Sequence, residues 1–101
     1  MAEWLPIEYR GFHDIPRMVV VMRENSLYLL DCPFDAELDD FSPRFTVYLL
    51  PSDTEYRISG MSWEGLPEIG ERIGEIPVDL VEFDATRREA IKSSVFTQLK
   101  D

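Results

Sequence analysis

Residues 17–50 constrain the fold of this chain more than any other segment. They contain three apolar runs, at residues 18–22, 27–30 and 45–50, which are separated by polar residues. The first run has the β-branched centre Val19-Val20-Val21 and is apolar on both sides of the pleat, a pattern typical of a central strand covered on both faces. A short polar turn at residues 24–26 leads into the second run, so the two runs predict an antiparallel hairpin.

Further short runs extend this pattern of strands and turns. The sequence predicts strands at residues 7–12, 17–23, 27–31, 44–50, 78–83 and, with weaker alternation, 56–62. Pro33 ends the third of these strands, because proline cannot donate a hydrogen bond to a ladder. Glycine and proline break the pattern over residues 60–77, where proline at a first helical position favours a short helical turn near residues 67–71.

A helix is predicted for about residues 84–99. Asp84 can serve as its N-cap, and Ile91, Val95 and Leu99 recur at a four-residue spacing that gives one apolar face. The expected fold is α+β and mainly β: a small bent antiparallel sheet, or a partly open barrel, of five to six strands within residues 1–83, followed by the C-terminal helix. A chain of 101 residues suits one domain, residues 1–101.

The charge balance limits the classes of partner. The chain carries 20 acidic and 10 basic residues, which give a formal net charge of −10. A nucleic-acid binder needs a basic surface that displaces counterions, and anionic lipid attracts basic segments. We therefore expect neither nucleic acid nor membrane as a partner, whereas a protein with a basic surface would be attracted over some distance.

Cysteine usage and the N-terminus indicate a cytoplasmic location. Cys32 is the single cysteine, which excludes an intrachain disulfide and suits a reducing compartment. The first residues lack the basic start and apolar centre of a signal peptide. The longest unbroken apolar run, residues 18–22, is far shorter than the roughly 20 residues that cross a bilayer.

Concentrated acidic charge follows the predicted hairpin. Between Arg23 and Arg44 every charged residue is acidic, and the residues that cluster most closely are Asp35, Glu37, Asp39 and Asp40. We expect these four to form a negatively charged loop at residues 35–40. Such a loop could meet the basic surface of a partner, or it could be a solvated connection whose charge only aids solubility. The position of the loop decides between these: a loop at the rim of a pocket or concave face would be a site, and a loop projecting alone would be a connection.

The same loop does not fit an EF-hand calcium site, although its clustered carboxylates could still hold a divalent cation in an irregular site. The alternating carboxylates resemble an EF-hand superficially, but Asp40 occupies the position of the required glycine and Thr46 that of the closing glutamate. A lone histidine and a lone cysteine also do not make a zinc site. We therefore expect no metal and no cofactor.

A nucleophilic cysteine is the main enzymatic alternative. Cys32 could combine with His13 and Asp14 in space, but its neighbours Asp31 and Asp35 raise the pKa of a thiol rather than lower it. A small buried residue at the end of a strand is the simpler interpretation of Cys32. A carboxylate pocket is the second form of this alternative.

The favoured interpretation is a non-enzymatic binding or regulatory module that recognises a basic protein surface through residues 35–40. Trp63 joins the candidate partner-binding residues, because it stands in an irregular glycine-rich stretch and is expected at the surface. The alternative is a small enzyme with a carboxylate or Cys32/His13 pocket. Self-association is a further expectation, since an exposed edge strand could pair with a second copy.

Overall fold

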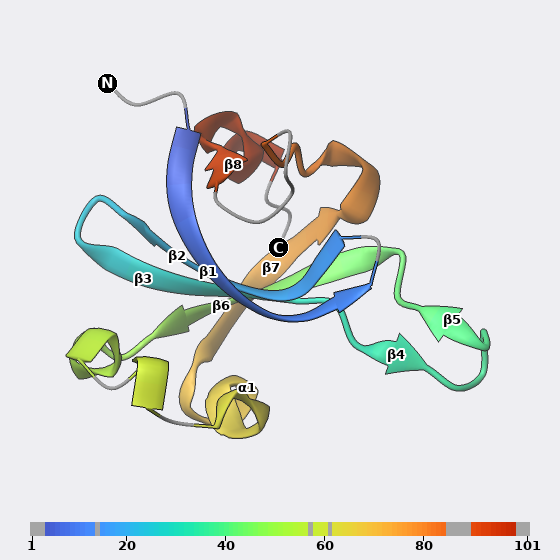
Figure 1. The fold of residues 1–101 in the computed structure, drawn as a ribbon, viewed down its shortest axis with the longest axis horizontal. Coiled ribbons are helices and arrows are strands. Elements are labelled where there is room, and N and C mark those ends of the chain that lie inside the picture. Colours follow the sequence, from blue (N-terminus) through green and yellow to red (C-terminus); the bar gives the residue numbers. More distant parts are fainter. Residues whose placement is uncertain (1–3, 14, 57, 61, 85–89, 99–101) are drawn as a thin grey trace.

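Six strands form one antiparallel sheet in the order β7-β6-β3-β2-β1-β8, and β4 and β5 form a separate two-stranded hairpin (Figure 1). The computed structural model describes residues 4–13, 15–56, 58–60, 62–84 and 90–98. The strands are β1 Trp4–His13, β2 Ile15–Arg23, β3 Ser26–Asp31, β4 Phe34–Asp35, β5 Asp40–Phe41, β6 Arg44–Leu50, β7 Glu71–Pro77 and β8 Ala90–Lys92. The helix α1 spans Leu66–Ile69, and 3-10 helices span Ser52–Tyr56, Ile58–Gly60, Trp63–Gly65, Val78–Leu80 and Ser93–Gln98.

Strands β2 and β3 lie in the middle of the sheet, as the two-sided apolar pattern predicts. Val19 and Val21 belong to one hydrophobic cluster and Val20 to another, because successive side chains of a strand point to opposite faces. All three side chains are almost completely buried. The sheet is therefore covered on both faces, and each face has its own core.

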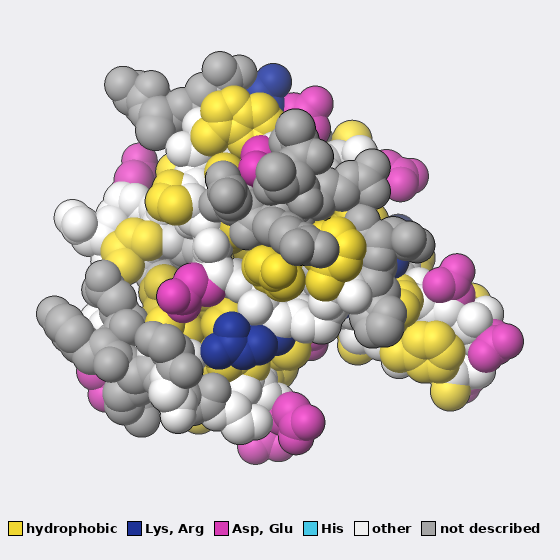
Figure 2. Space-filling view, viewed as in Figure 1, with side chains coloured by type: hydrophobic (Ala, Val, Ile, Leu, Met, Phe, Trp, Pro, Cys, Tyr) yellow, Lys and Arg dark blue, Asp and Glu magenta, His cyan; other side chains and the backbone are white. Residues whose placement is uncertain are grey.

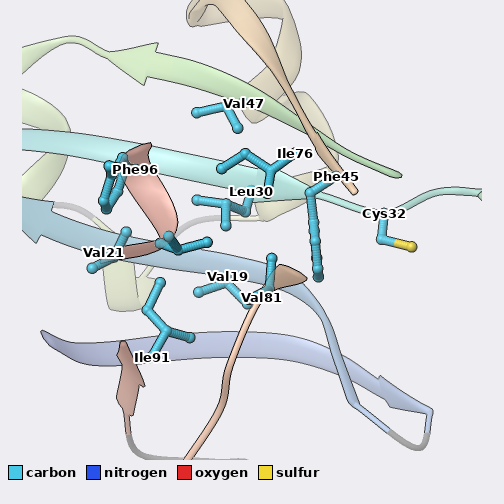
Figure 3. Packing of buried hydrophobic residues seen from close by; sticks show 11 residues of the cluster. Val19, Val21, Leu30, Cys32, Phe45, Val47, Ile76, Val81, Ile91 and Phe96 are labelled. Carbon is cyan, nitrogen blue, oxygen red and sulfur yellow. The ribbon is translucent and has the colours of Figure 1, made fainter. Parts of the chain in front are cut away.

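The first core lies against the segments that follow β7 (Figure 3). Residues of the sheet, of the chain after β7 and of the C-terminal 3-10 helix fill it together. Its buried members are Val19, Val21, Leu30, Cys32, Phe45, Val47, Ile76, Val81, Ile91, Val95 and Phe96. Cys32 lies at one end of this cluster (Figure 3), so the core extends to the point where the chain leaves the sheet after β3.

The second core lies on the opposite face, under the short helices of residues 52–69. It combines side chains of the sheet with side chains of this helical layer, namely Val20, Leu27, Leu29, Leu50, Ile58, Trp63 and Leu66. Figure 1 shows α1 on one side of the sheet and the 3-10 helix Ser93–Gln98 on the other. The domain therefore has three layers, with the sheet in the middle.

The predicted fold class is confirmed. The domain is mainly β, with a bent antiparallel sheet whose six strands match the expected number. The strands predicted at 7–12, 17–23, 27–31 and 44–50 fall within β1, β2, β3 and β6, and the helical turn predicted near 67–71 overlaps α1. The sheet does not close into a barrel, because β7 and β8 lie at its two ends.

Two predicted strands are wrong. Residues 56–62 contain the 3-10 helix Ile58–Gly60, and residues 78–83 begin with the 3-10 helix Val78–Leu80. The strand next to β6 is instead β7, which was not predicted. Its alternation is interrupted because Val47 pairs with Gly74 and Tyr48 with Arg72, which leaves Ile73 as a bulge residue.

The helical segment near the C-terminus is shorter than the predicted 84–99. Residues 90–92 form β8, which pairs with β1, and only the 3-10 helix Ser93–Gln98 is helical among the described residues that follow. The Lys92 N–H donates to the Glu82 carbonyl over 2.8 Å, and the Asp84 N–H donates to the Ala90 carbonyl over 2.9 Å. These two hydrogen bonds link neighbouring extended segments, as in a sheet, and they replace the hydrogen bonds that the predicted helix would have formed there. Residues 85–89 and Leu99 lie outside the described residues.

No helix within the described parts of the chain has the length and apolar character needed to cross a bilayer.

Candidate functional site

Residues 33–43 form an arm, built on β4 and β5, that projects from the sheet (Figure 1). In the arm Phe34 pairs with Phe41 and Asp35 with Asp40. The strands that it connects, β3 and β6, are antiparallel neighbours. Such neighbours need a connection of only about two to five residues, so the topology of the sheet does not require the arm.

Hydrogen bonds fasten the base of the arm. The Ser42 N–H donates to the Pro33 carbonyl over 2.8 Å, which joins the two legs. The Cys32 thiol donates to the Ser42 carbonyl over 3.2 Å. The Cys32 N–H donates to the Arg17 carbonyl of β2 over 2.7 Å. The arm is therefore tied both to itself and to a central strand.

Aromatic contacts extend this support outward from the base. The Arg17 guanidinium lies 4.2 Å from the centre of the Phe41 ring and also donates to the Cys32 sulfur over 3.4 Å. The Phe41 ring meets Phe34 in an edge-to-face contact, with 5.5 Å between ring centres and an interplanar angle of 89°. Cation–π and edge-to-face contacts of this kind are favourable, so the rings stiffen the part of the arm next to its base.

The structure brings all four predicted carboxylates onto this arm, where they divide into two pairs. Asp35 accepts a hydrogen bond from the Glu37 N–H over 2.9 Å, and Asp40 accepts one from the Phe41 N–H over 2.7 Å. Both therefore hold the backbone of the arm. The side chains of Glu37 and Asp39 are exposed and form no hydrogen bond or ion pair with the described part of the chain. Among the described contacts, Glu37 and Asp39 are therefore the carboxylates of the arm that do not bond its backbone.

Two large apolar side chains stand among these carboxylates. Phe34 and Leu38 are each 57% exposed, more than any other large hydrophobic side chain in the described part of the chain. Figure 2 shows hydrophobic and acidic side chains side by side on the projecting arm. Sequence reasoning overlooked both residues. For Leu38, which stands between Glu37 and Asp39 outside the predicted strands, the position was a usable signal.

The expectation that Trp63 lies at the surface is wrong. Its side chain is 3% exposed and belongs to the second core. The indole N–H donates to the Ile58 carbonyl over 2.8 Å, and the Arg10 guanidinium lies 4.5 Å from the centre of the ring. The irregular stretch around Trp63 folds over the sheet as a covering layer, which explains why a break in periodicity did not mean exposure.

The surroundings of Cys32 do not favour a nucleophile. The side chain is 2% exposed, and burial raises the pKa of its thiol, with the hydrogen bond from Arg17 as an opposing influence. A nucleophilic cysteine needs the thiolate. His13 lies on β1, whereas Cys32 directly follows β3, and β2 stands between these two strands in the sheet. The structure does not describe the side chain of His13.

A hollow of about 370 Å³ beside β8 has the Glu82 carboxylate in its wall. Its walls include Trp4, Phe83, Glu82 and Lys92. The Lys92 ammonium lies 3.4 Å from the Glu82 carboxylate, so this carboxylate already has a partner. In the described residues no group of three or more His, Cys, Asp or Glu side chains is arranged to hold a metal ion.

Comparisons with known proteins give no match to this chain among family models, curated protein sequences or solved structures.

Proposed function

We propose that the chain is a non-enzymatic binding module of the cytoplasm, whose arm docks on a basic surface of another protein. A loop that projects alone is expected to be a solvated connection, and the arm does project from the sheet (Figure 1). The hydrogen bonds at its base and the contact between Phe34 and Phe41, rather than the projection, therefore carry this proposal. Residues 33–43 include four carboxylates and no basic residue. A projecting element of one charge sign can reach a partner before the rest of the domain meets it.

The construction of the arm favours binding over a solvated connection. A connection between β3 and β6 could be far shorter, and solubility alone would not require hydrogen bonds at the base or the edge-to-face contact between Phe34 and Phe41. Internal support of this kind reduces the conformational entropy that is lost when a partner binds. The arm is therefore an ordered structure that presents its side chains in a fixed arrangement.

Exposed carboxylates contribute chiefly to the rate of association. A single surface ion pair contributes little to affinity, whereas a cluster of one sign attracts an oppositely charged partner and speeds the encounter. Glu37 and Asp39 are the side chains from which we expect this effect. Because exposed charges are screened over about 8 Å at physiological salt, binding should weaken as salt is added.

A defined basic peptide can serve as the probe. We would measure its dissociation constant and association rate by fluorescence, using a labelled peptide of Lys, Arg and Ser, from low to physiological salt. The double variant Glu37→Gln with Asp39→Asn removes two charges, and it keeps the turn because Asn tolerates the left-handed backbone of Asp39, whose φ is 52°. We expect about tenfold slower association at low salt.

The matched control removes two charges elsewhere. Glu64→Gln with Glu68→Gln changes two exposed carboxylates of the helical layer and leaves the same net charge as the arm variant. This control should associate with the peptide nearly as fast as the unchanged protein does. If the two double variants show equal decreases in the association rate, only the overall charge matters, and the proposal is overturned.

A further inference from the structure

We infer that the arm recognises a partner surface in which an apolar pocket is bordered by Lys or Arg, with Phe34 and Leu38 entering the pocket. This inference rests on the proposed function, because it names the chemistry of the partner that the arm would bind. A purely electrostatic contact would need only carboxylates. The two most exposed large apolar side chains of the described residues instead lie among those carboxylates.

Phe34 has the properties of an anchor residue. It is 57% exposed, yet its edge-to-face contact with Phe41 fixes the orientation of the ring. Aromatic side chains with few rotatable bonds bury a large apolar area at little entropic cost. A partner that covers this ring would remove its remaining apolar surface from water, which is the main source of affinity at the centre of an interface.

Leu38 lies at the tip of the arm and is held by the backbone. Its N–H donates to the Asp35 carbonyl over 3.1 Å, inside the turn that the Asp35 carboxylate also supports. The neighbouring Glu37 and Asp39 flank it directly in sequence and are exposed. An apolar side chain between two free carboxylates corresponds to the apolar centre and polar rim of protein interfaces.

Charge complementarity selects this occupant over the others. A second copy would bring the same four carboxylates and a net charge of −10 against the arm, and like charges in contact are unfavourable. Nucleic acid and anionic lipid are repelled for the same reason. A protein surface that combines an apolar pocket with a basic border complements both the exposed apolar side chains Phe34 and Leu38 and the carboxylates.

The experiment compares two peptides of equal positive charge. One contains Lys, Arg and Ser, and in the other Leu and Trp replace the Ser residues so that one side of the peptide is apolar. We expect the unchanged protein to bind the amphipathic peptide about tenfold more tightly than the polar one. Leu38→Ser and Phe34→Ser should each remove most of this difference, while both variants still bind the polar peptide.

The control variant is Leu80→Ser, which removes an exposed leucine outside the arm. Leu80 is 47% exposed and lies on the 3-10 helix Val78–Leu80. The Leu80→Ser variant should leave the preference for the amphipathic peptide unchanged. Circular dichroism would verify that every variant is folded. Leu38→Ser leaves the Phe34–Phe41 contact in place, so its result does not depend on the rings.

The outcomes separate the two proposals. If the polar peptide binds through the arm and the amphipathic peptide binds no better, the apolar pocket is wrong and electrostatic recognition stands. If Leu80→Ser reduces the preference as much as Leu38→Ser does, the preference comes from nonspecific hydrophobic binding and the inference is wrong. If neither peptide depends on the arm, the proposed function fails and the inference fails with it.

Discussion

A β-carbon placed on Gly70 would lie 2.9 Å from the β-carbon of Tyr48 and 3.2 Å from Cδ2 of Leu50. Gly70 ends α1 with a φ of −88°, an angle that any residue adopts, so the missing side chain matters for space rather than for backbone conformation. This close approach lets the chain pass from the helical layer into β7 alongside β6. The contact therefore joins the second core to the edge of the sheet.

We expect Gly70→Ala to destabilise the domain by about 1–3 kcal/mol, the usual cost of overpacking. The urea dependence of circular dichroism would give the free energy of unfolding. Gly65→Ala is the matched control, because nothing lies within 4 Å of its added β-carbon and its φ is also −88°. Gly65→Ala should change stability by only about 0.5 kcal/mol. A Gly70→Ala variant as stable as this control would contradict the steric argument.

Thr54 should be better replaced by valine. Its side chain is fully buried, and its Oγ1 has no hydrogen-bond partner within the described part of the chain. A buried hydroxyl without a partner costs free energy that a methyl group does not. Thr54→Val should stabilise the domain by about 1 kcal/mol, measured as a higher thermal midpoint and a higher urea midpoint.

Thr54→Ser provides the comparison, because it keeps the hydroxyl and removes the methyl group. It should destabilise the domain by about 1 kcal/mol through the lost apolar contact. Should Thr54→Val prove less stable than the unchanged protein, the hydroxyl must have a partner after all.

The centre of the fold could be predicted because its signal is local. A strand buried on both faces reads as a continuous apolar run, and Val19, Val20 and Val21 supply that run in adjacent positions. The edges could not be predicted in this way. Ile73 is a bulge residue that interrupts the alternation of β7, and β8 is a strand because Ile91 pairs with Leu5, a partner from the opposite end of the chain.

The candidate site was predictable in charge and not in shape. The acid-only composition of residues 35–40 identified the four carboxylates that the arm carries. That Asp35 and Asp40 support the backbone, while Glu37 and Asp39 make no side-chain bond to the described part of the chain, depends on the geometry of the turn. The exposure of Phe34 also required the structure, since an aromatic residue beside a strand is more often part of a core.

Cys32 should react slowly with alkylating reagents in the folded protein. Its side chain is 2% exposed, and burial raises the pKa of the thiol above its ordinary value of 9.0. Both effects reduce the amount of accessible thiolate, which is the reactive form. We expect alkylation by iodoacetamide near pH 8, followed by mass spectrometry, to be about 100-fold slower than in denaturant. Equal rates with and without denaturant would show that the base of the arm opens readily.

Asp31 gives the domain a pH dependence with a defined sign. It is half-buried at the end of β3, between Met18 and Thr46, and burial raises the pKa of its carboxyl above the ordinary 3.8. Well below pH 3.8 the carboxyl is neutral in both the folded and the unfolded chain, so the contribution to stability is fully present. As the pH rises through the raised pKa, the folded state must bury a charge and this contribution is lost.

Asp31→Asn removes that charge with little change in shape. We expect the variant and the unchanged protein to have similar free energies of unfolding well below pH 3.8. Above that pH the variant should become the more stable of the two, and the difference should level off once Asp31 is ionised in both states. Urea titrations across acidic and neutral pH would measure this difference.

The control for the change in net charge is Asp79→Asn, which replaces an exposed carboxylate of the 3-10 helix Val78–Leu80. If the difference in free energy of unfolding is constant with pH, or favours the unchanged protein at neutral pH, the folded protein does not disfavour the ionised form of Asp31.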